Sequence, residues 1–278
     1  MTDSDATDKP SARYRMCMAY DTIDCTVAES VGTITLDRPE AYNAINDRMA
    51  EELPIAARDL ASDDAVRAIA LTANGDVFNT GAALGTLSGD GSDEPQIRRL
   101  AAALHEFVGQ LVRAPKPVVT GVNGVAAGGG LGPAICGDIV LAADSARFEF
   151  AYPRMGLCGD GGSTYFLPRL VGLRRAQELV FRDEPVGAEE AAAIGLATET
   201  VPDGDLKDRL ATEAARLATG PTKGYAAAKR LLAESFDTSL EAQLADEADA
   251  MAELTNTTDF ARGHAAFGTD GSPEFIGE

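Results

Sequence analysis

The chain has 278 residues, 45% of them hydrophobic, which is enough to bury one full core with a helical appendage. Its formal charge of −20 would repel nucleic acids and anionic membranes, and no apolar run approaches the length of a membrane span. The polar, acidic N-terminus does not have the pattern of a secretory signal, so we expect a cytoplasmic protein. The acidic excess favours a halophilic source over a merely acidic mesophilic one, because high salt screens the self-repulsion of such a surface.

The cysteines and histidines predict neither disulfides nor a metal site. The four cysteines are scattered without a C-x-x-C pair, which is typical of a reduced intracellular protein. A histidine-based metal centre is not expected, because the chain has only His105 and His264.

The N-terminal part of the chain predicts a tail followed by alternating strands and helices. Residues 1–18 are mostly polar and predict a disordered tail. Two strands, 25–27 and 33–36, would form a hairpin. Asn46 can then cap a helix over residues 47–60.

The following stretch combines a buried strand with a glycine junction, a loop and a helix. A strand is expected over 66–72, and a glycine-containing junction lies at 78–84. Residues 85–94 are rich in Gly, Ser and Asp, which predicts a mobile loop or lid. Apolar residues then recur at helical spacing over 97–111, and this helix would stop before Pro115.

The segment 116–132 is the most informative part of the chain. A β-rich run ends in a turn at Asn123-Gly124, and three consecutive glycines, 128–130, lead into an apolar stretch. Glycines at a strand-to-helix junction expose backbone N–H donors, so the segment predicts a site for an oxyanion or a phosphate. It does not match the G-x-G-x-x-G pattern of dinucleotide-binding proteins.

The remainder of the chain continues the alternation and then becomes wholly helical. Strands are expected over 139–142, 147–150 and 198–201, and helices over 170–181 and 188–194. Three further helices are predicted over 206–218, 222–234 and 239–254. The whole pattern predicts an α/β core followed by an α-helical C-terminal region.

Several motifs occur in one order along residues 26–277. They are ITLDRPEAYNAI at 34–45, FNTGAAL at 78–84, the glycine segment 116–132, CGDI at 136–139, GLCGDGG at 156–162 and LPRLVG at 167–172. In this order and spacing they resemble the crotonase superfamily of enoyl-CoA hydratases and isomerases. The resemblance implies a crotonase spiral of ββα units over residues 19–205 and an α-helical trimerisation region over 206–278.

The resemblance also implies a ligand and an assembly. Members of the superfamily bind acyl-CoA thioesters and stabilise a thioester enolate, with coenzyme A as part of the substrate and no other cofactor. They commonly form homotrimers or dimers of trimers. The glycine segment would therefore bind an oxyanion through the N–H groups of Ala82 and Gly129, with Gly81 and Gly128 contacting the substrate. The alternative is that these glycines only permit close packing of a strand and a helix.

Hydratases of the family hold and activate water with two glutamates, whose positions in this sequence are Gly132 and Tyr152. Gly132 has no side chain, and the reference pKa of tyrosine is about 10, so the usual hydration route is disfavoured. Tyr152 is expected to contact the substrate instead.

Asp160 is the candidate acid and base. Its surroundings resemble those in 1,2-epoxyphenylacetyl-CoA isomerases, which carry an aspartate at this place, as do dienoyl-CoA isomerases and 4-chlorobenzoyl-CoA dehalogenases. A single carboxylate suffices for isomerisation, because it can remove a proton beside the thioester and return it further along the chain. Alternatively, Asp160 only accepts hydrogen bonds within its glycine turn.

His105 lies where the dehalogenases place their histidine base. Together with Asp160 it would permit aryl-CoA substitution, in which Asp160 attacks the ring and His105 activates water. A lone histidine on an amphipathic helix is, however, more often structural.

The expected coenzyme A contacts depart from the family pattern. The family's C-terminal Phe-x-x-Lys-Arg reads Phe267-Gly-Thr-Asp-Gly here, and the acidic residue would repel phosphate. Phe267 is kept as a candidate substrate contact, and Arg38 is a candidate cation for the phosphates.

The sequence therefore favours an acyl-CoA isomerase with Asp160 as acid and base and with Ala82 and Gly129 as oxyanion hole. An aryl-CoA dehalogenase or thioester hydrolase that uses Asp160 and His105 is the second reading, and an enoyl-CoA hydratase the third. A non-catalytic acyl-CoA-binding homologue is the fourth, because both glutamate positions lack a carboxylate.

Overall fold

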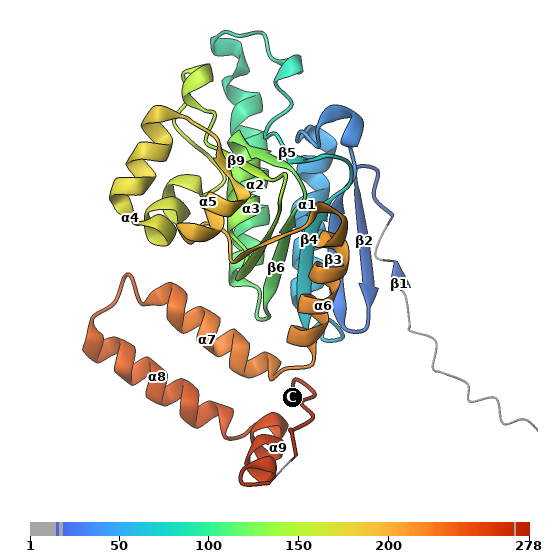
Figure 1. Cartoon of the computed structure of the whole chain (residues 1–278), viewed down its shortest axis with the longest axis vertical. Coiled ribbons are helices and arrows are strands. Elements are labelled where there is room, and N and C mark those ends of the chain that lie inside the picture. Colours follow the sequence, from blue (N-terminus) through green and yellow to red (C-terminus); the bar gives the residue numbers. More distant parts are fainter. Residues whose placement is uncertain (1–14, 17–18, 270) are drawn as a thin grey trace, which may run out of the picture.

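A computed structural model describes residues 15–16, 19–269 and 271–278 as an α/β fold with a helical C-terminal arm (Figure 1). The predicted disordered tail, residues 1–18, lies outside the described residues except for β1 (Arg15–Met16). This two-residue strand pairs antiparallel with β2 (Ile23–Ala28).

The main sheet has seven strands in the order β1-β2-β3-β4-β6-β8-β11. Its further members are β3 (Val31–Leu36), β4 (Ala68–Ala73), β6 (Val118–Val122), β8 (Ile139–Ala143) and β11 (Glu199–Val201). β2 and β3 form the predicted antiparallel hairpin, and every later neighbour is parallel. All residues of β4 and β6 are buried, because helices cover both faces of a parallel sheet.

A second, smaller sheet has the order β10-β9-β7-β5. Its strands are β5 (Val77–Asn79), β7 (Val125–Ala127), β9 (Arg147–Glu149) and β10 (Val186–Gly187). Only β9 was predicted, because strands of two or three residues are too short to show an alternating pattern. This sheet matters for the site, since β5 and β7 are parallel neighbours and each ends at one of the two glycine junctions.

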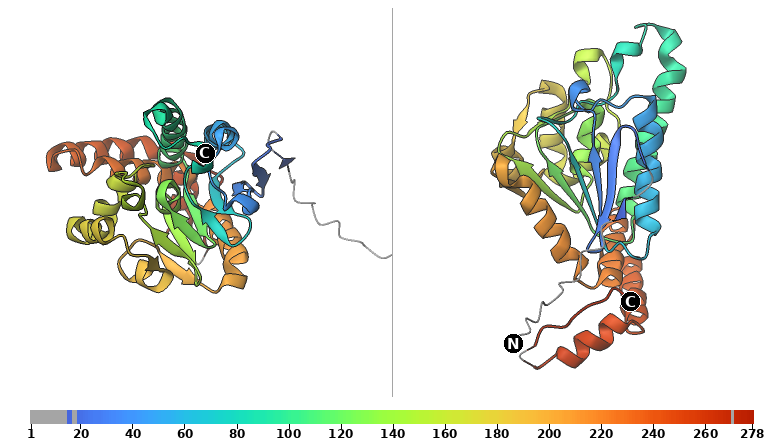
Figure 2. Two further views of the ribbon diagram at one scale, coloured as in Figure 1. Left: turned by 90° about the horizontal axis from the view of Figure 1, so that it is seen from above. Right: turned by 90° about the vertical axis from the view of Figure 1, so that its right-hand side faces the viewer.

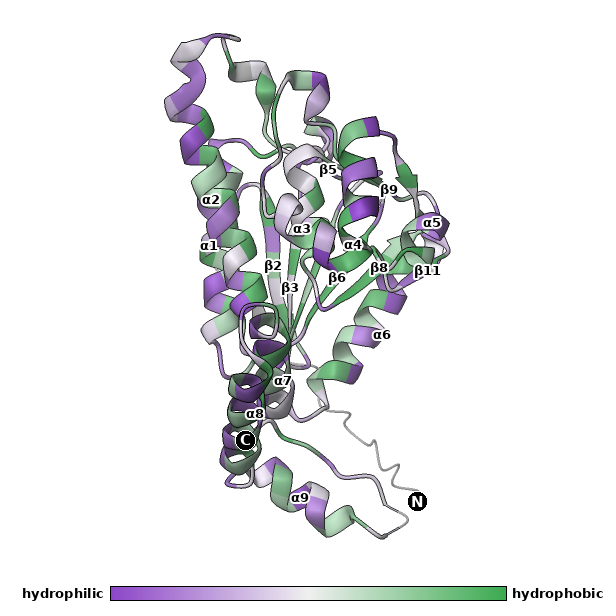
Figure 3. Cartoon of the chain, turned by 90° about the vertical axis from the view of Figure 1, so that its left-hand side faces the viewer, coloured by the Kyte–Doolittle hydropathy of each residue, from purple (hydrophilic) through white to green (hydrophobic). Residues whose placement is uncertain are grey.

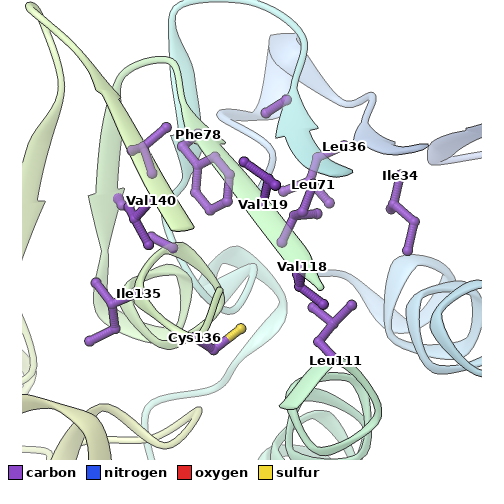
Figure 4. Close-up of a cluster of buried hydrophobic side chains, with 14 of the residues drawn as sticks. Ile34, Leu36, Leu71, Phe78, Leu111, Val118, Val119, Ile135, Cys136 and Val140 are labelled. Atoms are coloured by element: carbon purple, nitrogen blue, oxygen red, sulfur yellow. The ribbon is translucent and has the colours of Figure 1, made fainter. Parts of the chain in front are cut away.

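Helices cover the main sheet on both sides (Figure 2). α1 (Asp47–Ser62) packs against α2 (Glu94–Arg113) on one face, and α6 (Leu206–Ala218) packs against β4 and β6 on the other. The Asn46 side chain accepts a hydrogen bond from the Met49 N–H at 2.9 Å, which confirms the predicted helix cap. Figure 4 shows part of the core between these layers, with Leu71, Phe78 and Val119 at its centre.

The fourth helix begins earlier than predicted. α4 spans Ser163–Arg182, whereas the sequence predicted a helix over 170–181. Pro168 is unfavourable inside a helix, and Gly172 interrupts this one with φ 75° and ψ 153°. The residues before this kink are nevertheless helical, so the region that follows Asp160 is rigid rather than a loop.

The predicted loop at 85–94 contains local structure of its own. A 3₁₀ turn forms over Gly91–Asp93, and α2 begins directly afterwards at Glu94. The Asp93 carboxylate accepts hydrogen bonds from the N–H groups of Ser88 and Gly89, at 2.8 and 2.7 Å. Whether the loop moves as a lid stays a prediction.

The C-terminal helices divide into two groups. α6 belongs to the core, whereas α7 (Thr222–Glu234), α8 (Leu240–Leu254) and α9 (Thr258–Ala266) extend below it (Figure 1). The predicted helical region at 206–278 therefore includes one helix that packs on the main sheet. Two short helices complete the fold, α3 (Leu131–Ile135) and α5 (Ala188–Ala193). No helix in the described ranges is both long enough and apolar enough to cross a membrane.

Lys229 fastens α7 to the core. Its Nζ donates to the Leu111 carbonyl at 2.9 Å and lies 2.8 Å from Oδ2 of Asp138, and only 12% of its side chain is exposed. Lys229→Met should lower the free energy of unfolding by about 2 kcal/mol, because Asp138 would lose its cation in a half-buried setting. Urea denaturation would measure this, with the exposed Lys223→Met on the same helix as control. Equal losses in both variants would contradict it.

Candidate active site

Two glycine junctions meet at one edge of the second sheet. β5 leads into Gly81 and β7 leads into Gly128, and the parallel pairing of these strands brings both junctions together. A Cβ at Gly81 would lie only 2.6 Å from the Gly129 nitrogen, and Gly81 has φ +81°. A side chain at Gly81 would separate the junctions, so the close approach requires glycine there.

The main chain at Ala82 lies beside the main chain at Gly129. Ile45 bridges to Ala82 through its N–H to the Gly81 carbonyl and through its carbonyl to the Ala83 N–H. In such a parallel bridge the Ala82 N–H points away from Ile45. A Cβ at Gly129 would lie 3.7 Å from the Ala82 nitrogen. The two predicted donors therefore belong to adjacent main-chain segments, and an oxyanion hole formed by their N–H groups stays a prediction.

Asp160 lies in a turn built by three glycines. Gly159, Gly161 and Gly162 have φ values of +108°, +58° and +79°. The Asp160 backbone carbonyl accepts hydrogen bonds from the N–H and the Oγ of buried Ser163, at 3.0 and 2.8 Å. The backbone therefore holds the turn, and the carboxylate contacts Nε2 of His105 instead. This is against the reading that the Asp160 side chain only stabilises its own turn.

The Asp160 turn packs directly on the oxyanion junction. A Cβ at Gly161 would lie 3.2 Å from the Gly129 carbonyl oxygen and 3.1 Å from Cδ2 of Leu104. Leu104 precedes His105 on α2, so one helix contacts the turn with two successive residues. Asp160, His105 and the predicted donors thus lie in one region, although they are far apart in the sequence.

The same turn fills the space beside Gly132. A Cβ at Gly132 would lie 2.6 Å from the Gly161 carbonyl carbon and would overlap the carbonyl oxygen. A side chain at residue 132 is therefore sterically excluded while the Asp160 turn keeps its position. The sequence showed that the first hydratase glutamate is absent, and the structure shows that no room exists for it.

Tyr152 stands at the second hydratase position as a buried phenol. Its side chain belongs to the buried core, with 8% of the residue exposed. Burial first, and then the nearby Asp160 carboxylate, raise the pKa of Tyr152 well above its usual range. The phenol therefore stays protonated and cannot replace a glutamate as a base.

A groove of about 1330 Å³ opens beside Asp160 and His105. Its walls come from α2, from the Asp160 turn with the start of α4, and from α7. The groove also receives three cations that were not singled out from the sequence, namely Arg113, Lys229 and Arg230. Lys229 and Arg230 are adjacent basic residues in an acidic chain, and this was the signal in the sequence that could have identified them.

Two predicted substrate contacts lie away from this groove. The Arg38 guanidinium donates to the Ala44 carbonyl, in the loop before Ile45. Phe267 follows α9 and is 90% exposed, at the end of the arm far from the second sheet (Figure 1). It lines a separate apolar cavity of about 430 Å³ between α7, α8 and α9. Within one chain, the structure does not bring Phe267 to Asp160.

Comparison with known proteins supplies the family context. Residues 26–278 match the family described as Enoyl-CoA hydratase/isomerase. A Rhodobacter capsulatus protein described as "Probable enoyl-CoA hydratase" is 42% identical and covers 94% of this chain and 100% of its own. The 1,2-epoxyphenylacetyl-CoA isomerase of Escherichia coli K12 is 36% identical over 91% of this chain and 97% of its own. An enoyl-CoA hydratase structure from Bacillus anthracis has a TM-score of 0.87 at 27% identity, covering 93% and 100%.

Proposed function

Because the chain belongs to the enoyl-CoA hydratase/isomerase family, we propose that it isomerises an acyl-CoA thioester by proton transfer. The thioester oxygen accepts hydrogen bonds from the N–H groups of Ala82 and Gly129. The Asp160 carboxylate removes a proton from the acyl group, and the negative charge passes to the thioester oxygen as an enolate. Asp160 then returns the proton at a different carbon.

The observation that carries this proposal is the packing of the Asp160 turn against Gly132. A hydratase of the two-glutamate kind needs a carboxylate at residue 132, and the Gly161 carbonyl occupies that volume. The turn that excludes this carboxylate is the one that presents Asp160 to the groove. One carboxylate beside two main-chain donors supports proton transfer, whereas water addition by that route needs two.

His105 would assist Asp160 in this reaction. Its Nε2 contacts Oδ1 of Asp160, so an N–H at this nitrogen would stabilise the carboxylate before proton transfer. His105 is half-exposed on α2, so water can satisfy its other ring nitrogen.

Turnover of a 3-enoyl-CoA tests the proposal. The wild-type protein should convert it to the conjugated 2-enoyl-CoA, with deuterium from heavy water entering the acyl chain. Turnover of any CoA thioester that depends on Asp160 would also exclude a non-catalytic binding role. A protein that hydrates a 2-enoyl-CoA but does not convert a 3-enoyl-CoA to a 2-enoyl-CoA would overturn the isomerase assignment.

The contact between His105 and Asp160 favours aryl-CoA dehalogenation or thioester hydrolysis as a second candidate. In that reaction Asp160 would attack the acyl group or the ring, and His105 would activate the water that releases the intermediate. Halide release from a 4-haloaryl-CoA, or release of free coenzyme A, would support it. Retention of either activity in His105→Gln would exclude the proposed water activation.

We also propose that the arm of α7, α8 and α9 mediates a homotrimer or a dimer of trimers. Large apolar side chains are exposed on and between α7 and α8, namely Leu232, Phe236, Leu240, Leu244 and Met251. Figure 3 shows hydrophobic residues among hydrophilic ones along this arm. Exposed apolar side chains of this number favour burial against another subunit. In such an assembly Phe267 would contact a neighbouring subunit or its substrate.

A further inference from the structure

The Tyr152 hydroxyl is buried, and its proton has no acceptor within hydrogen-bond distance among the described residues. Buried polar groups nearly always have a partner, so an exception near an active site needs an explanation. The neighbouring ring of Phe150 is 5.0 Å away, centroid to centroid, and offers no acceptor of comparable strength. The hydroxyl proton therefore lacks an acceptor among the described residues.

The fold fixes the direction of this side chain. The Tyr152 N–H donates to the Phe150 carbonyl at 2.8 Å, and its own carbonyl accepts from the N–H groups of Met155 and Leu157, both at 3.0 Å. The preceding Ala151 has φ +58°, and its N–H donates to Oδ1 of Asp183 at 2.6 Å. These hydrogen bonds fix the main chain at residue 152, and burial of the ring against Phe150 leaves it little room to turn to another partner.

The strongest acceptor near the phenol is the Asp160 carboxylate, which acts on it electrostatically. Phe150 links the two residues, because its ring packs on Tyr152 and also lies 2.9 Å from the position of a Cβ at Gly159. The Asp160 main-chain N–H also acts on the phenol oxygen, but as a donor, and the Cys158 thiol is only a weak acceptor. The phenol stays protonated in this setting, so it can only donate to the carboxylate.

We propose that Tyr152 is a positioning residue for Asp160: it donates a hydrogen bond to the carboxylate once that group turns from His105 toward the bound acyl group. The inference rests on the function proposed above. His105 and Tyr152 would then be alternative partners of Asp160, in the substrate-free and the substrate-bound enzyme.

Other charged groups border the same groove and could affect Asp160. They are Arg113 on α2, Lys229, Arg230 and Glu234 on α7, and Asp237 and Asp246 beyond it. Lys229 is paired with Asp138, and Arg230 with Glu234, which reduces the effect of these two cations. Tyr152 differs from all of them because it is buried and does not line the groove.

Tyr152→Phe tests the inference, since it removes the hydroxyl and keeps the ring that packs on Phe150. We expect kcat to fall by about tenfold, the usual effect of losing a hydrogen bond to a charged group, with KM changed less than about twofold. The acid limb of the kcat/KM profile should move to higher pH, because a donor to the ionised form of the base is lost. Tyr225→Phe, which removes a hydroxyl outside the groove, should change neither.

A binding experiment without turnover separates this inference from the reaction itself. The chain has only two histidines, so NMR can follow the His105 ring resonances, assigned with His105→Gln. Saturating phenylacetyl-CoA should move the His105 ring resonances in the wild type, because the carboxylate turns away, and should move them clearly less in Tyr152→Phe.

The outcomes distinguish the two proposals. Equal His105 shifts together with unchanged kcat in Tyr152→Phe would overturn the role of Tyr152 and leave the isomerase standing. A change in KM alone would make Tyr152 a substrate contact. A Tyr152-dependent His105 shift in a protein without isomerase turnover would keep the positioning role and reject the reaction. No His105 shift in the wild type would overturn the turning of Asp160.

Discussion

Asp160→Asn is expected to lower the rate of double-bond migration by about 10²–10⁴-fold, the usual contribution of a positioned acid–base group. Asparagine has nearly the shape of aspartate, and the turn is held by the Asp160 backbone carbonyl and Ser163. The fold should therefore be retained. KM should change little, because the N–H groups of Ala82 and Gly129 would still hold the thioester.

The measurement is the initial rate of conversion of 3-enoyl-CoA to 2-enoyl-CoA, with deuterium incorporation as a second readout. Asp24→Asn is a matched control, since Asp24 is an exposed residue of β2. Thermal unfolding of both variants checks the fold. Equal turnover by Asp160→Asn and the wild type would remove Asp160 as the base, and the proposed mechanism with it.

Gly132→Ala is the second change for which we expect a large loss, of about 10²-fold or more. The added Cβ would overlap the Gly161 carbonyl, so the Asp160 turn has to move, and a displacement of about 1 Å at a catalytic group costs on the order of 10²-fold. Gly204→Ala is the control, because a Cβ at Gly204 meets nothing within 4 Å.

The same position tests the hydratase reading directly. Gly132→Glu combined with Tyr152→Glu restores both carboxylates of a two-glutamate hydratase. We expect no hydration of 2-enoyl-CoA, because the first glutamate cannot occupy the volume of the Gly161 carbonyl. A folded double variant that adds water would show that the turn can move aside, and would reopen the hydratase reading.

The regular elements of the fold could be predicted from sequence because local chemistry specifies them. Asn46 caps α1 as expected, and α6 and α7 begin and end at the predicted residues. The apolar runs of β4 and β6 are typical of strands buried on both faces. In each case the information lies within a few consecutive residues.

The second sheet and the start of α4 could not be predicted in this way. β5, β7 and β10 are two or three residues long, and their pairing depends on neighbours from distant parts of the chain. The first turns of α4 contain Pro168 and precede Gly172, which both suggest a loop. Tertiary packing overrides these local preferences.

The sequence by itself determined the family, the α/β core with its helical C-terminus, and a short set of candidate residues that included Asp160, His105 and the two glycine junctions. Only the tertiary structure decided which candidates meet: His105 contacts Asp160, whereas Phe267 lies at the end of α9. The tertiary structure also showed that the Gly161 carbonyl leaves no room for a side chain at residue 132. The physical reason is that side-chain contacts and occupied volume depend on residues brought together from separate segments, and no local pattern records them.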